Sequence, residues 1–399
     1  MKILVVSINY FPEPARITDI CEELVKRGHD VTVITEVPNC PKGDFYEGYP
    51  DGRARDEVIN GVKVHRCFTI ARKTGAFRRV LSYYSYVFSS VNYVRHMKDE
   101  FDVVFVNQLS PIMLAYAGAE YKKRFGKKIL FYSMDLWPMS LIVGGIKEGT
   151  PVFKYFHRVS EKLYKSADVL IGTSRSFPEY FEKEFGITGM KYLPQYAEAL
   201  FTPEQCKKVP SETFDIMFAG NIGNFQRVDT IIKAAALTKD NKRIRWHLLG
   251  DGSELENLKK LAQSLNADNV IFHGRKPLDE MPKYYSMADA MVVTMMKNPV
   301  ISLTLPGKVQ SYMAAGKPIL GAIDGETQLV VKEADCGLCG DAEDAEQLAK
   351  NAIIMAGQSM EKYARNSYKY NEKYFNKEKF MQTIIKELEA LVVRAYRGK

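Results

Sequence analysis

The stretch Ile3-Leu-Val-Val-Ser-Ile8 is a short apolar run that predicts a buried strand of a parallel sheet. A Pro-bearing loop from Tyr10 to Arg16 follows, and apolar residues then recur at helical spacing from Ile17 to Val25. The helix is expected to end at Gly28, and Asp30-Val-Thr-Val-Ile-Thr35 supplies a second strand. Strand, helix and strand in this order form a βαβ unit, which places ligands at the carboxyl ends of its strands. The stretch therefore predicts an α/β fold.

The same alternation of strand and helix continues along the chain and restarts at Phe214, after a polar, Pro-bearing stretch. With 399 residues, of which 46% are hydrophobic, the chain is long enough for two buried cores. We therefore predict a first domain over residues 1–199 and a second over residues 200–375. The last segment, 376–399, has apolar residues at helical spacing and is expected to pack back on the first domain.

The net charge indicates which kinds of molecule the protein could bind, and the cysteines indicate in which cellular compartment it works. The net charge of +8 favours anionic partners, which include nucleotides, phospholipid headgroups and nucleic acid. Six scattered cysteines form no disulfide framework, which favours the cytoplasm, and the lone Cys336–Cys339 pair is not expected to bind a metal. The apolar run at the start is too short for a signal peptide, and no run is long enough to cross a membrane. We expect a soluble or membrane-peripheral protein.

The segment 61–98 contains no acidic residue, although it carries eight Lys and Arg residues. Within it, apolar and aromatic residues recur at helical spacing from Phe77 to Val94. A basic, aromatic-rich amphipathic segment is typical of binding to an anionic membrane surface. The alternative is a helix packed on the domain with a solvated basic edge. Nucleic-acid binding is not expected, because no recognised module accompanies the charge.

Polar residues follow the strands of the first half. The loop after the first strand lacks the G-x-G-x-x-G pattern, which argues against a nicotinamide-binding oxidoreductase. Glu13 and Arg16 stand where a substrate could be held, or they are solvated loop charges. Asp135 follows a later strand and is a candidate catalytic or acceptor-orienting carboxylate. Trp137 offers a flat apolar face to a sugar or a lipid-linked substrate, unless it packs in the core.

Glycine-rich turns follow the strands of the second half, at Gly220 to Gly223, Gly250-Asp-Gly252 and Gly274. Further on, a polar loop leads through Pro306-Gly-Lys308 into a short predicted helix from Val309 to Ala315. The first amides of a helix have no internal acceptor, and the helix dipole adds partial positive charge there. Lys308 adds a full charge. The pattern predicts an anion site at this helix start.

Taken in order, the motifs resemble a known family. They are Ile3 to Pro14, Asp135-Leu-Trp-Pro138, Met217 to Gly223, Gly250-Asp-Gly252, Gly274-Arg-Lys-Pro277 and Pro306 to Pro318. Together they resemble the retaining family 4 glycosyltransferases of GT-B fold, whose two Rossmann-like domains face each other across a cleft. The sequence is most similar to the bacterial subgroup that builds O-antigen, capsule and colanic-acid-type polysaccharides, which includes N-acetyl-L-fucosamine transferases.

The resemblance implies that the second domain binds a nucleotide-sugar donor, usually UDP-linked, and that the first binds the acceptor. It implies that Lys308 neutralises the leaving diphosphate, that Asp135 serves the chemistry, and that neither metal nor cofactor is required. For the acceptor it implies Glu13, Arg16 and Trp137. For the donor it implies Gly220, Asn221, Gly223, Gln226, Gly250, Asp251, Gly252, Arg275, Lys276, Pro277, Thr304 and Ser311.

Four positions depart from the family pattern. Many relatives carry two glutamates eight positions apart, of which the second holds the ribose hydroxyls, whereas Leu303 and Ser311 stand at these positions here. Gln226 replaces a common Lys, and Met134 replaces a common His. We therefore expect Lys308 to balance most of the phosphate charge. Arg16 and Arg227 are further candidates for this role.

The sequence thus predicts a retaining glycosyltransferase at the inner face of the cytoplasmic membrane of a bacterium. It would move an N-acetylated hexosamine or deoxyhexosamine from UDP to a lipid-linked saccharide acceptor in surface polysaccharide synthesis. Two alternatives are a UDP-sugar epimerase of the same architecture and a non-catalytic partner in a polysaccharide assembly complex. Acceptor-dependent turnover separates the first hypothesis from both alternatives.

Overall fold

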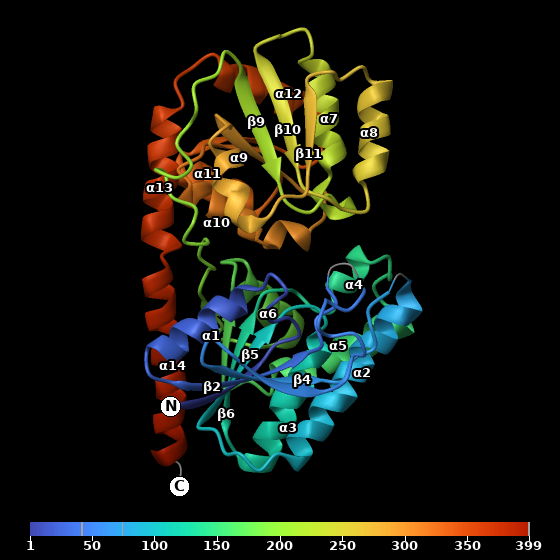
Figure 1. The fold of residues 1–399 in the computed structure, drawn as a ribbon, viewed down its shortest axis with the longest axis vertical. Coiled ribbons are helices and arrows are strands. Elements are labelled where there is room, and N and C mark those ends of the chain that lie inside the picture. The colour runs from blue at the N-terminus through green and yellow to red at the C-terminus, as the bar shows by residue number, and fades with distance from the viewer. Residues whose placement is uncertain (41–42, 74, 398–399) are drawn as a thin grey trace. The chain divides into compact units, whose positions relative to one another are not determined.

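The computed structural model describes residues 1–40, 43–73 and 75–397, which form two compact units. Unit 1 consists of Met1–Thr173, Phe177–Leu193 and Met381–Lys399, and unit 2 consists of Ser174–Ser176 and Pro194–Phe380. Each unit is built around one sheet with helices on both faces (Figure 1). Among the described residues, no helix is long and apolar enough to span a membrane.

Unit 1 contains an eight-stranded sheet in the order β3-β4-β2-β1-β5-β6-β7-β8, in which only β3 pairs antiparallel. The strands are β1 (Lys2–Val6), β2 (Asp30–Glu36), β3 (Arg55–Ile59), β4 (Val62–Cys67), β5 (Val103–Gln108), β6 (Lys128–Ser133), β7 (Val169–Gly172) and β8 (Lys191–Tyr192). Because β1 lies between β2 and β5, its residues from Ile3 to Val6 are fully buried. This explains the continuous apolar run in the sequence.

Helices cover both faces of this sheet. In Figure 1, α1 and α14 lie on one side of it and α2 and α3 on the other. The helices are α1 (Arg16–Lys26), α2 (Ala76–His96), η1 (Ile112–Ala115), α3 (Tyr116–Phe125), α4 (Ser140–Val143), α5 (Pro151–Tyr164), α6 (Phe177–Phe185) and α14 (Lys377–Arg397). From Met381 onward α14 belongs to unit 1, where Glu387 pairs with Lys191 at 2.6 Å.

Unit 2 contains a six-stranded, fully parallel sheet in the order β11-β10-β9-β12-β13-β14. The strands are β9 (Phe214–Ala219), β10 (Ile244–Leu249), β11 (Val270–Gly274), β12 (Ala290–Thr294), β13 (Ile319–Ala322) and β14 (Gly337–Gly340). The strand order reverses between β9 and β12. In doubly wound sheets, ligands bind beyond the carboxyl ends of the strands at this reversal.

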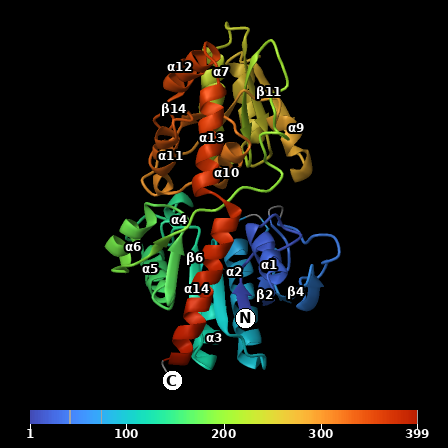
Figure 2. The same ribbon diagram turned by 90° about the vertical axis from the view of Figure 1, so that its left-hand side faces the viewer.

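Two separate apolar cores fill the two faces of the unit 2 sheet. Helices α7, α8 and α12 close the core around Trp246, and α9, α10, α11 and α13 close the core around Tyr312. Figure 2 shows α13 running beside α10 and α11. The helices are η2 (Asn224–Gln226), α7 (Val228–Leu237), α8 (Leu255–Ser264), η3 (Leu278–Glu280), α9 (Met281–Tyr285), η4 (Ile301–Leu303), α10 (Gly307–Ala314), α11 (Glu326–Ala334), α12 (Ala345–Ala356) and α13 (Glu361–Tyr374).

The basic segment 61–98 is not one amphipathic element, so the prediction that assigned all of it to a membrane surface is wrong in its first part. Residues Val62–Cys67 form β4, and the Arg66 side chain is fully buried. Its Nε atom lies 3.0 Å from a carboxylate oxygen of Glu57 on β3, so its charge is balanced inside the unit. Only α2 remains as a candidate membrane surface within this segment.

Candidate functional site

The three glycine turns of unit 2 meet at the carboxyl edge of its sheet. They follow β9, β10 and β11, which are neighbours in the sheet. The backbone N–H of Gly220 donates to the carbonyl of Leu249 at 2.9 Å, and that of Gly250 donates to the carbonyl of Gly274 at 3.0 Å. The sequence predicted each turn separately, and the structure brings them into contact.

Close contact between the turns explains why glycine stands at 250 and 252. A Cβ atom at Gly250 would lie 1.8 Å from the Gly220 carbonyl oxygen, and one at Gly252 would lie 2.3 Å from the Ile222 oxygen. Gly250 also has φ of 148°, which L side chains rarely adopt. Two hydrogen bonds, from the Ile222 N–H to the Asp251 carbonyl and from the Glu254 N–H to the Ile222 carbonyl, tie the turns together. Larger residues would force the two turns apart.

Tyr312 fixes α10 against the end of β9. Its side chain is fully buried. The phenol oxygen accepts a hydrogen bond from the Ala219 N–H and donates one to the Ala219 carbonyl, both at 3.0 Å. Because Ala219 directly precedes Gly220, this pair of bonds sets the start of α10 beside the first glycine turn.

Lys308 lies in the first turn of α10 and points back toward that glycine turn. Part of the residue is accessible, but its Nζ atom is fully enclosed and has no hydrogen-bond partner among the described residues. A Cβ atom added to Gly220 would lie 2.9 Å from Nζ, and Nζ stands 3.8 Å from the centre of the Phe218 ring. Burial lowers the pKa of the Lys308 ammonium to about 7. The predicted anion site therefore contains an enclosed amine that no carboxylate neutralises.

The turn after β9 is held in shape by Gln226. Its side-chain oxygen accepts the Gly223 N–H at 3.1 Å and the Asn221 side-chain N–H at 3.3 Å. The Gln226 carbonyl accepts the hydroxyl of Thr294 at the end of β12 at 2.6 Å. Gln226 therefore orders the turn from within, and it brings no charge.

Arg227, a candidate for extra phosphate compensation, is already paired. Its guanidinium donates to both carboxylate oxygens of Asp229 and lies 3.0 Å from Glu343. Because two acids balance it, it offers a phosphate less charge than Lys308 does.

Ser311 has a partner that the sequence did not indicate. Its hydroxyl donates to a carboxylate oxygen of Glu198 at 2.9 Å, across 113 residues of chain. The position at which many relatives carry a glutamate is therefore next to an acid that comes from another segment of unit 2. No local pattern predicted this contact, because Glu198 lies in the irregular segment that leads into the unit.

The remaining predicted donor residues lie on the flanking segments. Arg275, Lys276 and Pro277 directly follow Gly274, and the Lys276 ammonium stands 5.5 Å from the centre of the Tyr284 ring. Thr304 precedes α10, and its hydroxyl donates to the Ile301 carbonyl at 2.7 Å. Arg275, Lys276 and Pro277 therefore lie next to the third glycine turn, whereas the Thr304 hydroxyl is hydrogen-bonded within the segment 301–304.

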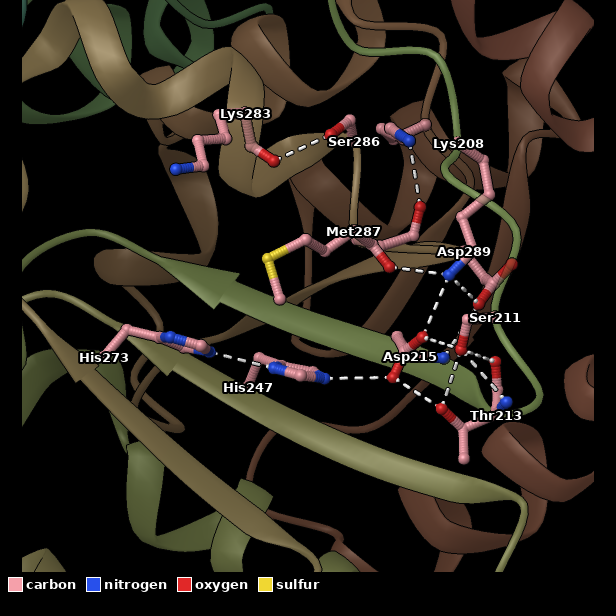
Figure 3. A network of polar contacts seen from close by, with 12 residues as sticks. Lys208, Ser211, Thr213, Asp215, His247, His273, Lys283, Ser286, Met287 and Asp289 are labelled. Carbon is pink, nitrogen blue, oxygen red and sulfur yellow. Dashed lines mark hydrogen bonds and ion pairs between the residues drawn. The ribbon is translucent and has the colours of Figure 1, made fainter.

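A chain of polar groups joins the three neighbouring strands β9, β10 and β11 of the unit 2 sheet (Figure 3). His273 on β11 contacts His247 on β10 at 2.9 Å, and His247 contacts Asp215 on β9 at 3.0 Å. Asp215 also accepts from Lys208 at 2.9 Å and from Ser211 at 2.8 Å. Burial alone would raise the pKa of Asp215, but the bonds from His247, Lys208 and Ser211 outweigh it and hold that pKa well below its usual value.

In unit 1, Asp135 lies beyond β6 and is held by two hydroxyls. The Ser140 hydroxyl donates to one carboxylate oxygen at 2.6 Å, and the Ser110 hydroxyl donates to the other. The indole N–H of Trp137 donates to the same Ser110 oxygen at 2.7 Å. Asp135, Ser110, Ser140 and Trp137 therefore form one cluster, in which the sequence had identified only Asp135 and Trp137.

The other predicted acceptor residues of unit 1 have structural partners. The Trp137 ring is buried and packs edge-on against Phe156, so it presents no open face for stacking. Glu13 is also buried, and one of its oxygens accepts the backbone N–H groups of Asn39 and Cys40 at 2.8 and 2.6 Å. Arg16 is partly exposed at the start of α1. Glu13 thus anchors the loop after β2, and Trp137 positions Ser110.

Among the described residues, no group of three or more His, Cys, Asp or Glu side chains is placed to hold a metal ion.

Comparison with known families assigns both halves of the chain. Residues 203–373 match the sequence model of the glycosyl transferases group 1, and residues 15–193 match that of glycosyltransferase family 4. The first match falls in unit 2, which holds the glycine turns and Lys308, and the second falls almost wholly in unit 1.

Individual relatives agree with these matches. WcaI of Escherichia coli K12, named for a glycosyl transferase of colanic acid biosynthesis, is 24% identical over 410 residues, which cover 97% of this chain and 100% of WcaI. Sucrose-phosphate synthase from Thermosynechococcus elongatus has a TM-score of 0.78 at 17% identity, covering 98% of this chain and 99% of that one. HepE of Anabaena, solved with UDP and glucose, has a TM-score of 0.69 at 17% identity, covering 98% and 100%. The predicted fold of two Rossmann-like domains, of the GT-B class, is confirmed.

We predict that Asp215→Asn destabilises the protein at neutral pH and not in acid. Because the pKa of Asp215 is lower in the folded chain than in the unfolded chain, its carboxylate stabilises the fold above the unfolded pKa, and this contribution is lost as the pH falls. We expect a loss of about 2 kcal/mol near pH 7, the usual contribution of charged hydrogen bonds, that shrinks below about pH 4. Thermal melts of wild type, Asp215→Asn and the exposed control Asp240→Asn measure it. A pH-independent difference would contradict the prediction.

Proposed function

Because the chain carries a family 4 glycosyltransferase domain followed by a group 1 glycosyltransferase domain, it is a glycosyltransferase, and we propose that it transfers a sugar from UDP to a lipid-linked saccharide with retention of configuration. The sugar in this proposal is an N-acetylated hexosamine or deoxyhexosamine, and the product is a bacterial surface polysaccharide. The similarity to WcaI, named for colanic acid biosynthesis, supports the pathway, and the likeness to HepE, solved with UDP and glucose, supports the donor nucleotide.

The observation that carries the proposal is the enclosed Lys308 amine beside the glycine turn of β9. A nucleotide diphosphate is an anion that fits an amine, a glycine turn and the start of a helix placed together. In the proposed transfer, the oxygen of an acceptor hydroxyl forms a bond to the sugar carbon C1, and the bond between C1 and the diphosphate oxygen breaks. The electron pair of the broken bond leaves with UDP, whose phosphate takes up the hydroxyl proton. We assign to Lys308 and to the first amides of α10 the stabilisation of this developing charge.

Glu198 completes the donor site in this proposal. The carboxylate lies beside Ser311, where the family pattern places a residue that holds the ribose hydroxyls. A carboxylate that accepts both hydroxyls of a ribose selects a ribonucleotide, and a segment outside α10 supplies it here. Glu198 thus stands in for the glutamate that the motif lacks.

We assign the acceptor to unit 1, at Asp135. Two hydroxyls orient the carboxylate, yet each carboxylate oxygen keeps a further lone pair that can accept a hydrogen bond from a sugar hydroxyl. Glu13 and Trp137 act in this proposal through the loops that they hold, and Arg16 remains the candidate for direct contact.

Membrane association, which we propose at the inner face of the cytoplasmic membrane, rests on the outer face of α2. Phe77 and Phe88 are 75% and 70% exposed, and Val80, Leu81 and the neighbouring α5 residue Tyr155 are also exposed. The Tyr84 hydroxyl on α2 lies 3.4 Å from that of Tyr155, which ties the two helices together. Arg78 and Arg79 stand exposed on the same helix. Exposed aromatic and basic residues on one helix suit an anionic lipid surface.

Lys308→Met should reduce turnover about 10²- to 10³-fold, because it removes a group that stabilises charge in the transition state. UDP release from candidate UDP-sugars, measured with and without a lipid-linked acceptor, tests both the residue and the reaction. Lys283→Met on α9, an exposed lysine of the same unit, is the matched control. Equal activity of the Lys308→Met variant would remove Lys308 from the mechanism. Conversion of UDP-sugar without acceptor would indicate an epimerase.

Glu198→Gln should weaken UDP binding at least about tenfold, since hydrogen bonds to a charged group contribute about 1.5–3 kcal/mol. Calorimetric titration with UDP and with 2′-deoxy-UDP checks this assignment, because a ribose contact predicts that the variant no longer distinguishes the two nucleotides. Glu204→Gln, an exposed acid six positions further along the same segment, should bind as wild type does. Unchanged discrimination in Glu198→Gln would exclude the ribose contact.

Replacing both exposed phenylalanines, as Phe77→Ser/Phe88→Ser, should abolish most binding to vesicles, because their apolar area no longer enters the bilayer. Arg78→Gln/Arg79→Gln should weaken binding to anionic vesicles about 30-fold, at about 1 kcal/mol per charge, and leave binding to neutral vesicles unchanged. Co-sedimentation with phosphatidylglycerol–phosphatidylcholine vesicles of varied composition measures both. Ile353→Ser/Ile354→Ser on α12, which is similarly exposed, is the control. Vesicle binding that depends neither on the fraction of anionic lipid nor on the salt concentration would contradict the proposal.

A further inference from the structure

Lys308 presents an electrostatic problem when the donor site is empty. Its Nζ atom is enclosed, and among the described residues it has neither a hydrogen-bond acceptor nor an ion-pair partner. Enclosing an unpaired charge in protein is unfavourable. The Phe218 ring, whose centre lies 3.8 Å from Nζ, offsets part of this cost. A protonated Lys308 is therefore unfavourable until an anion arrives.

The elements around Lys308 supply no compensating charge. β9 contributes the Phe218 ring and the backbone of Gly220. The acids and bases of the neighbouring segments are engaged elsewhere: Asp251 accepts the N–H of Gly252, Arg227 pairs with Asp229 and Glu343, and Glu198 accepts the hydroxyl of Ser311. Burial is the sole cause of the lowered pKa of Lys308, which stands at about 7. No neighbouring side chain thus opposes or supports its titration.

We propose that above neutral pH Lys308 is a neutral amine in the empty enzyme and that each diphosphate that binds there brings one proton onto it from solvent. This inference rests on the proposed donor site. The proton adds to the Nζ lone pair, and the resulting ammonium forms an ion pair with the phosphate oxygens. The enclosure that disfavours a lone charge then strengthens the pair, because both partners lie away from bulk water. Donor binding and protonation are therefore linked.

The linkage determines how affinity depends on pH. The nucleotide complex holds one more proton than the empty enzyme, so raising the pH favours the empty enzyme. Above the pKa of the free amine, affinity for the diphosphate falls about tenfold per pH unit. Below that pKa the amine is already protonated, and the affinity no longer changes through Lys308. The proposed linkage therefore weakens the binding of UDP as the pH rises above the pKa of the free amine.

Calorimetric titration of the full chain with UDP, in pairs of buffers that differ in ionisation enthalpy, counts the protons exchanged on binding. We expect uptake of about 0.9 proton per UDP near pH 8 and about 0.1 near pH 6 from Lys308. Lys308→Arg is the matched variant, because arginine stays charged throughout this range. Its proton count reports the exchange by the phosphate of UDP itself, so the difference between the two proteins isolates Lys308.

Uridine provides a second control that needs no variant. It carries the base and the ribose and lacks the diphosphate, so wild type should bind it with no proton uptake at either pH. UDP binding to wild type near pH 8 without a proton, or with the same count as uridine, would overturn the inference and leave the donor site intact. Absence of any UDP binding would overturn the proposed function together with the inference.

Discussion

The contact between Tyr312 and Ala219 determines where the start of α10 lies against the sheet of unit 2. A single buried phenol is hydrogen-bonded to both backbone polar groups of Ala219, the last residue of β9, at 3.0 Å each. Because a buried donor or acceptor without a partner costs about 1–3 kcal/mol, α10 has one favourable position against the sheet edge. From that position the Lys308 amine lies close to Gly220, so that a Cβ atom there would stand 2.9 Å from Nζ. A helix start, a glycine turn and a cation thus become one site.

Unit 2 contains two buried ionisable groups, the Asp215 carboxylate and the Lys308 amine, whose surroundings differ. Asp215 is surrounded by Lys208, His247 and Ser211, so its charge is balanced within the protein and stabilises the fold. Among the described residues the Lys308 Nζ atom has no hydrogen-bond partner, and in the proposed function a bound anion becomes its partner. The contrast separates a structural ion network from a binding group by physical criteria: the first is complete without a ligand, and the second is not.

The family matches indicate a glycosyltransferase, but several residues around the proposed donor site differ from the family pattern. Where the motif lacks its acid, Ser311 is hydrogen-bonded to Glu198, and where relatives carry a lysine, Gln226 orders the turn without charge. Arg227 is engaged by Asp229 and Glu343. In the proposed donor site the uncompensated positive charge is therefore concentrated on Lys308, which is why the proposed binding depends on the protonation state of this side chain.

The sequence by itself determined what depends on local order: the strands predicted at Ile3–Ile8 and Asp30–Thr35, which correspond to β1 and β2, the glycine turns, and Lys308 at a helix start. Apolar runs and turn residues encode these features within a few positions. Only the tertiary structure decided that Arg66 is buried, that Trp137 faces Phe156, and that Glu198 meets Ser311. These contacts join residues far apart in the chain, and the packing that selects among possible partners leaves no periodic signal in the sequence.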